Sequence, residues 1–191
     1  MPVLLLLLLA ACGPKEPVSP GRAAYLQSNC RTCHQIEGEG KYAGPDLTFV
    51  GFRHKKEWLD KWLEAPEKVK PNTTMPNPRF TPETRRAVVE YMMTLQGDGL
   101  KEKDGRRLFR LAGCTGCHGE GGRGGYPDVP QLARTASTYT RDELIHKIRD
   151  GVKTGKELDM PAWGAKLTED QLAALADYLL TLKDTAPDPG F

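Results

Sequence analysis

The feature that most constrains this chain is a short motif, Cys-x-x-Cys-His, that occurs twice. It spans residues 30–34 (Cys-Arg-Thr-Cys-His) and residues 114–118 (Cys-Thr-Gly-Cys-His). Two intervening residues place the paired cysteines about one helical turn apart. The pattern is typical of c-type haem attachment, in which both thiols form thioethers with the haem and the histidine binds the iron. The sequence therefore predicts two covalently attached haem c groups, held by Cys30, Cys33 and His34 and by Cys114, Cys117 and His118.

Paired cysteines have two other common roles. A four-thiolate zinc site also uses Cys-x-x-Cys pairs, but here one pair lies in each half of the chain and each pair is followed by histidine. A redox-active disulfide is expected beside alternating strands and helices, a pattern that this sequence does not contain. Haem attachment is the better interpretation of both motifs.

The beginning of the chain predicts export, which agrees with haem c attachment outside the cytoplasm. Residues 3–11 form an apolar run with six consecutive leucines, too short for the roughly 20 residues of a membrane-spanning helix but suited to a signal peptide. Leu9-Ala10-Ala11-Cys12 resembles a bacterial lipoprotein box, with an incidental cysteine as the alternative. We assign residues 1–11 to a signal peptide and residues 12–20 to an N-terminus lipidated at Cys12 and a proline-rich tether. The expected location is the bacterial periplasm or the outer face of the cytoplasmic membrane.

The repetition extends well beyond the two motifs. Each motif histidine is followed, at nearly the same spacing, by a Met-Pro pair, Met75-Pro76 or Met160-Pro161. Each half also has a Gly-x-x-x-aromatic segment, a Pro-x-Leu step and a closing segment with a tyrosine (Gly21 and Gly105, Pro45 and Pro130, Tyr91 and Tyr178). The sequence thus predicts two copies of one haem domain, residues 21–97 and 105–191, joined by a linker at residues 98–104.

The local signals are helical in both halves. Thr140 and Thr168 each begin a capping box, and Thr81-Pro82 places a proline at the first position of a helix. No segment shows the sustained alternation of a strand. The expected fold class is all-α, and a domain of about 80 residues with so little regular structure would be marginal without a haem in its core.

Each half resembles a class I cytochrome c, with an N-terminal helix, the attachment motif, a Pro-x-Leu loop, a Met-Pro loop and a C-terminal helix. The tandem resembles the small two-domain dihaem cytochromes c. This resemblance implies a few short helices wrapped around each haem, with the first and last helices crossing beside it. It also implies that the carbonyl groups of Pro45 and Pro130 orient the motif histidines.

Met75 and Met160 are the candidates for the sixth iron ligand, because they occupy matching positions in the two halves. A thioether opposite histidine raises the reduction potential of the iron, which suits electron transfer. Met92 and Met93 lie within a predicted helix and are expected to pack in the core.

The other histidines and the charged residues give weaker indications of function. His54 and His146 are expected to be structural. A basic cluster at Arg53, Lys55, Lys56 and Lys61 is either a docking surface for an acidic partner or a solvated helix face. The formal net charge of +2 gives no indication of nucleic-acid binding.

The expected function is single-electron transfer between respiratory redox proteins by a membrane-tethered dihaem cytochrome, with no small-molecule substrate. One alternative is a cytochrome subunit of a larger oxidase or reductase complex. The other is a dihaem enzyme, which would need an exchangeable iron position. Because both halves offer a methionine ligand, we expect an electron-transfer protein rather than an enzyme.

Overall fold

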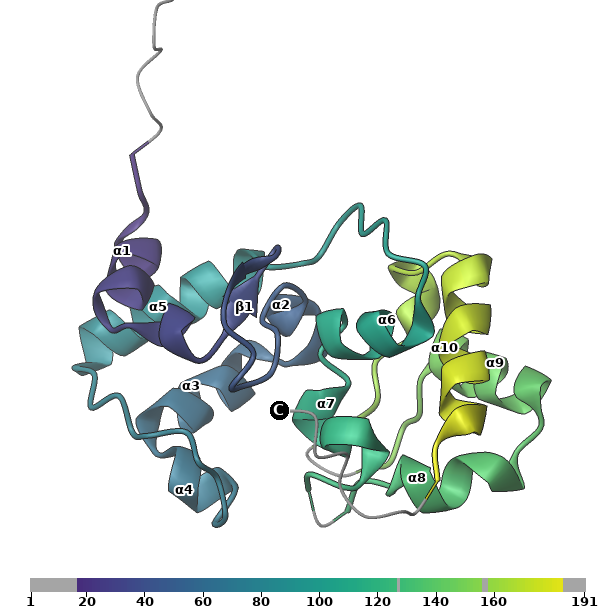
Figure 1. Ribbon diagram of the computed structural model, residues 1–191. Coiled ribbons are helices and arrows are strands. Elements are labelled where there is room, and N and C mark those ends of the chain that lie inside the picture. The colour runs from purple at the N-terminus through teal and green to yellow at the C-terminus, as the bar shows by residue number, and fades with distance from the viewer. Residues whose placement is uncertain (1–16, 127, 156–157, 184–191) are drawn as a thin grey trace, which may run out of the picture.

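Two helical halves lie side by side in the computed structural model, which describes residues 17–126, 128–155 and 158–183 (Figure 1). The predicted signal peptide and Cys12 lie outside the described residues. Short helices dominate, so the predicted all-α class is confirmed. Among the described helices, none has both the length and the apolar character needed to cross a membrane.

The first half combines short α-helices with a 3-10 turn and a small β-ladder. In chain order its described elements are α1 (Pro20–Gln27), η1 (Cys30–Thr32), β1 (Gln35–Ile36), β2 (Glu39–Gly40), α2 (Val50–Arg53), α3 (Lys56–Glu64), α4 (Pro66–Val69) and α5 (Pro82–Thr94). The two strands pair antiparallel, with Gln35 opposite Gly40. They close the loop directly after the first attachment motif.

The second half repeats the long helices but replaces the ladder with 3-10 turns. Its described elements are α6 (Gly105–Leu111), α7 (Thr115–His118), η2 (Glu120–Gly122), α8 (Leu132–Thr135), η3 (Ala136–Thr138), α9 (Arg141–Asp150), η4 (Trp163–Ala165) and α10 (Glu169–Thr181). Thr140 and Thr168 form complete capping boxes at α9 and α10, as their sequences predict. Thr81 caps α5, where Pro82 occupies the first turn.

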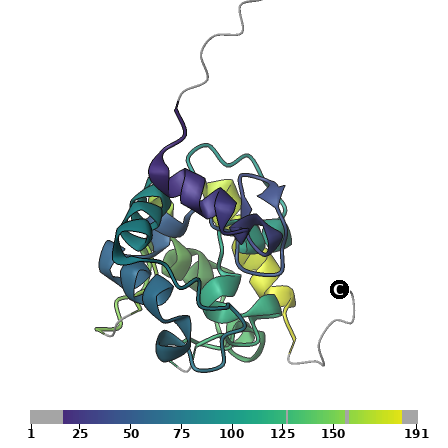
Figure 2. The same cartoon turned by 90° about the vertical axis from the view of Figure 1, so that its left-hand side faces the viewer.

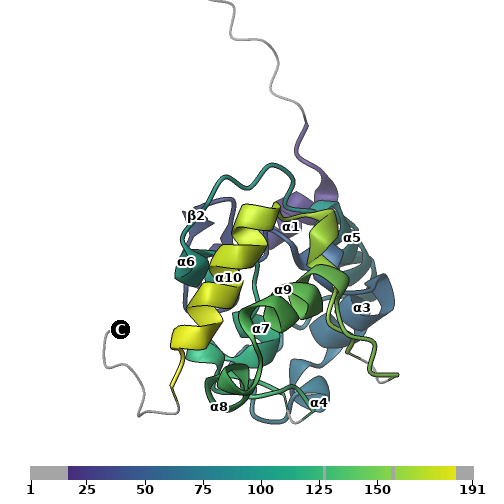
Figure 3. The same ribbon diagram turned by 90° about the vertical axis from the view of Figure 1, so that its right-hand side faces the viewer.

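In both halves, the first helix crosses the last at a glycine. Helix α1 packs on α5 (Figure 2) and α6 packs on α10 (Figure 3). A Cβ atom at Gly21 would overlap the carbonyl oxygen of Ala87, and one at Gly105 would overlap that of Ala174. An aromatic pair lies beside each crossing at nearly the same geometry, with ring centroids 5.7 Å apart for Tyr25–Tyr91 and 5.6 Å apart for Phe109–Tyr178. The repeat in sequence is therefore also a repeat in packing.

Phe49, from the first half, is buried in the core of the second half. Its side chain is 0% exposed and belongs to the same apolar cluster as Leu108 and Leu172. The rings of Phe49 and Phe52 both pack edge-on against Trp163, at centroid distances of 5.4 and 5.1 Å. This contact removes apolar surface of both halves from water and holds them together.

The segment predicted as a linker is fastened to the second half. The amide of Gln171 donates hydrogen bonds to the carbonyl oxygens of Leu100 and Glu102, both at 2.9 Å. Lys166 forms an ion pair with Asp98 at 2.6 Å. Residues 98–104 thus follow a fixed path between α5 and α6.

We predict that Gly21→Ala destabilises the protein by about 1–3 kcal/mol, because the added methyl group must push α1 away from α5. Urea unfolding followed by circular dichroism measures the change. Gln27→Ala, at an exposed position near the end of the same helix, is the control. Equal stability of the two variants would contradict the close crossing.

Candidate haem-binding sites

Each attachment motif forms a tight turn that presents its histidine to a proline carbonyl. The backbone N–H of His34 bonds to Cys30 O at 2.9 Å, and that of His118 bonds to Cys114 O at 2.9 Å. The Nδ1 of His34 donates to the carbonyl oxygen of Pro45 at 2.8 Å, and that of His118 donates to Pro130 at 3.1 Å. Because Nδ1 carries the proton, Nε2 keeps its lone pair and is able to bind a metal.

The surroundings of both histidines favour the neutral imidazole that a metal ligand must be. Burial lowers the pKa of His34 and of His118, against the opposing effect of the bond to each proline carbonyl. The ring of His34 lies directly on Gly44, where a Cβ atom would come within 2.6 Å of the ring. Glycine at this position gives the imidazole its place beside the Pro45 loop.

None of the four motif cysteines forms a disulfide with another. Burial raises the pKa of the Cys114 thiol to about 12 and raises the pKa values of Cys30 and Cys117 as well. Within the described residues, which include all four cysteines, no three His, Cys, Asp or Glu side chains cluster as a metal ion would require. The pairs are thus not brought together as a four-thiolate zinc site would need.

The two candidate methionine ligands are held in place by different contacts. Trp62 donates its indole N–H to the sulfur of Met75 at 3.0 Å, and Trp62 in turn stacks on Trp58 at a centroid distance of 5.3 Å. Met160 is held through its backbone, which exchanges two 3.0 Å hydrogen bonds with Val152. Both methionines are half-buried against the apolar core of their own half.

A haem fits the residues present. Each half supplies a Cys-x-x-Cys pair, an imidazole with an open Nε2 and a half-buried thioether, which is a suitable donor set for haem c. In the first half, the indole nitrogen of Trp58 is buried without a hydrogen-bond partner among the described residues. A buried donor of this kind is satisfied when a polar group of a ligand lies against it.

Other features singled out in the sequence have structural explanations. His54 stacks on Trp58 at 3.8 Å, and burial together with the charge of Arg53 lowers its pKa to about 3. His146 is exposed and lies 4.0 Å from Asp150. Met92 is 6% exposed in the first core, as predicted.

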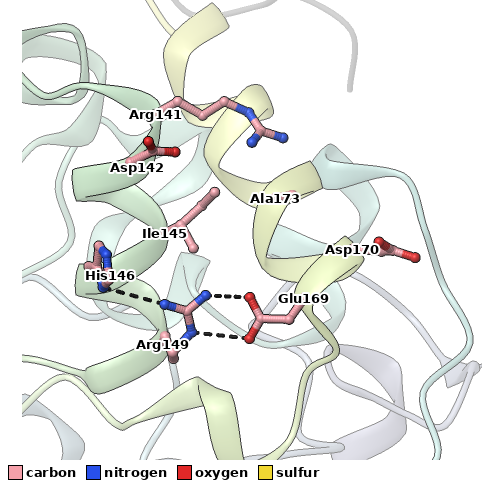
Figure 4. Close-up of a pocket in the computed structure, with 8 residues that line it drawn as sticks. All are labelled: Arg141, Asp142, Ile145, His146, Arg149, Glu169, Asp170 and Ala173. Carbon is pink, nitrogen blue, oxygen red and sulfur yellow. Dashed lines mark hydrogen bonds and ion pairs between the residues drawn. The ribbon is translucent and has the colours of Figure 1, made fainter.

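The surface hollow between α9 and α10 is not a haem site (Figure 4). Arg149 crosses it to form an ion pair with Glu169, and His146 lies beside Arg149. Its other lining residues are Arg141, Asp142, Ile145, Asp170 and Ala173. It contains no cysteine, methionine or buried imidazole that would bind iron.

The prediction of a basic surface cluster in the first half is wrong for Arg53. Lys55 and Lys56 are exposed, and Lys56 pairs with Glu90 at 3.6 Å. Arg53 instead turns inward, because it lies on α2 where that helix meets the second half. Sequence reasoning also missed Trp62 as the donor to the sulfur of Met75.

Comparisons with known proteins agree with the geometry. Residues 18–96 match the family described as cytochrome c, and residues 101–179 match cytochrome c oxidase, cbb3-type, subunit III. The curated relatives include cytochrome c oxidase subunit 2 of Alkalihalophilus pseudofirmus, 29% identical over 85 residues (40% of this chain and 25% of the relative). Cytochrome c oxidase subunit 2 of Bacillus subtilis is 28% identical over 93 residues (41% and 26%).

The chain spans only about a quarter of the length of these relatives. No solved structure matches it at a significant level. The two family matches nevertheless cover nearly all of the described residues, one on each half. The protein therefore belongs to the c-type cytochromes and consists of two class I cytochrome c domains in tandem.

Proposed function

We propose that this protein is a dihaem electron carrier tethered to the outer face of a bacterial membrane, passing single electrons between respiratory redox proteins. The observation that carries the proposal is the repeated arrangement in which a motif histidine bonds to a proline carbonyl and a methionine follows at the matching position. Two such sites would hold two haems, each with protein ligands on both faces of the iron. A closed iron exchanges electrons without binding a substrate.

The protein's own residues would fix the ligands and exclude water. Cys30, Cys33, Cys114 and Cys117 would hold the haems covalently, and a haem c iron supplies one-electron exchange when bound. Pro45 and Pro130 hold the rings of His34 and His118 in one orientation and one tautomer. Met75 and Met160 would close the opposite faces, with Trp62 fixing the sulfur of Met75.

The donors and acceptors are proposed to be redox proteins, and terminal oxidases are the favoured acceptors. The second half resembles a family described as an oxidase subunit, and the curated relatives carry the same kind of name. This similarity favours one alternative, in which the chain is itself a subunit of an oxidase complex. Blue-native electrophoresis of gently solubilised membranes separates the two: a free carrier migrates near its own mass, and a subunit co-migrates with oxidase haem.

We expect the Soret band of the dithionite-reduced protein to stay unchanged when carbon monoxide is added, because His34 and Met75, and His118 and Met160, would leave neither iron an open position. Met75→Ala and Met160→Ala should each open one iron, so that carbon monoxide shifts about half of the Soret absorbance of the reduced protein. In the oxidised protein, each variant should lose about half of the sulfur-to-iron charge-transfer band. Met93→Ala is the matched control and should retain the full band. Mass spectrometry first checks for two covalent haems.

Carbon monoxide binding to one haem of the unmodified protein would contradict the carrier function and favour an enzyme with an exchangeable site. A mass with fewer than two haems would contradict the proposed cofactor content.

We predict that Cys12→Ser moves the protein from the membrane fraction to the soluble periplasmic fraction, because a doubly acylated cysteine gives stable anchoring. Immunoblotting of fractions washed with high salt measures the change. Retention of the variant on washed membranes would rule out the lipid anchor.

A further inference from the structure

Arg53 joins the loop that holds His34 to the turn that carries the second haem-attachment motif. Its Nη2 donates to the carbonyl oxygen of Asp46, next to Pro45, at 2.7 Å. Its Nη1 donates to the carbonyl oxygen of Gly113, next to Cys114, at 2.7 Å. One guanidinium thus bridges two backbone segments that belong to different halves of the chain and to different haem sites.

The second motif is shaped to receive this side chain. Gly113 has φ of +73°, and a Cβ atom there would overlap the guanidinium of Arg53. A Cβ atom at Gly116 would lie 3.0 Å from Arg53 Nη1 and 3.5 Å from the Cβ of Pro45. The Pro45 loop of the first site therefore lies against the Cys114–Cys117 turn, with Arg53 beside it.

The positive charge of Arg53 acts on both sites. Its guanidinium bonds to the residue before Cys114 in the second site and to the residue after Pro45 in the first. Among the described residues no carboxylate forms an ion pair with Arg53, and its Nε is buried without a hydrogen-bond partner.

We propose that Arg53 is a positioning residue that locks the two haem sites together and places one positive charge between them. The inference rests on the proposed dihaem state but concerns the contact between the halves. A ferric haem carries one more positive charge than a ferrous haem, so the charge of Arg53 raises the reduction potential of both. The potential of each haem is then set partly by a residue at the contact between the halves.

The test compares Arg53→Gln with Arg53→Lys in the intact protein, after mass spectrometry has counted two haems in each. Hydrogen exchange of the peptide covering residues 113–118 measures how firmly Arg53 holds the second attachment turn. A potentiometric titration measures the reduction potentials of both haems. Arg85→Gln is the matched control, because Arg85 pairs with Asp60 at 2.9 Å and Glu64 at 3.1 Å within the first half.

We expect Arg53→Gln to speed exchange at residues 113–118 by about tenfold or more, as for loss of a hydrogen bond from a charged donor. Both potentials should fall together. Arg53→Lys keeps the charge but is unable to bridge both carbonyls in the same way, so exchange should remain fast while the potentials largely recover. Arg85→Gln should change neither readout.

Unchanged exchange at residues 113–118 in Arg53→Gln would overturn the proposal that Arg53 holds the two sites together. A fall in the reduction potential of only one haem would overturn the proposal that its charge acts on both. If Arg53→Gln does not fold, Arg53→Lys still decides the exchange result. A protein with fewer than two haems would contradict the proposed function while leaving the exchange result as a separate test of the lock.

Discussion

A hydrogen bond to a backbone carbonyl sets the direction in which each motif histidine presents its free ring nitrogen. The bond exists only if the loop carrying Pro45 or Pro130 comes back against the attachment turn. In the first half, Gly44 and the small β-ladder bring that loop back. In the second half, glycines with positive φ around η2 let the chain turn back toward the attachment motif. Other residues would be strained in this backbone conformation. The long helices then need only to cross beside this centre, and both pairs cross at a glycine.

The two halves are most alike around the motif histidines and differ more around the candidate methionine ligands. Trp62 and Met75 form a side-chain hydrogen bond, whereas Met160 is fixed by its backbone bridge to Val152. A hydrogen bond to a ligand draws electron density away from it, so the two irons would not have identical surroundings even with the same ligand types. The two halves thus differ most at the residues that hold their methionines.

Much of this arrangement follows from the sequence, because it depends on short motifs and local helix signals. The attachment turns, both capping boxes and the paired helices at Gly21 and Gly105 are properties of neighbouring residues or of the repeat itself. The contact between the halves is different. Nothing near Phe49 or Arg53 in the sequence indicates that their partners are Trp163 and Gly113, because those partners lie in the other half of the chain. Arg53 resembles a surface residue when it is seen beside Lys55 and Lys56, and only tertiary packing separates them.

A flexible linker between two haem domains would raise the concentration of each near the other but leave their separation variable. Here the linker is fixed by Gln171, the aromatic contact is buried, and Arg53 bonds across the junction. Electron transfer between fixed sites depends on one separation and orientation rather than on an average over many. The packed contact therefore holds the two small cytochrome c domains in one arrangement, which a covalent connection alone would not do.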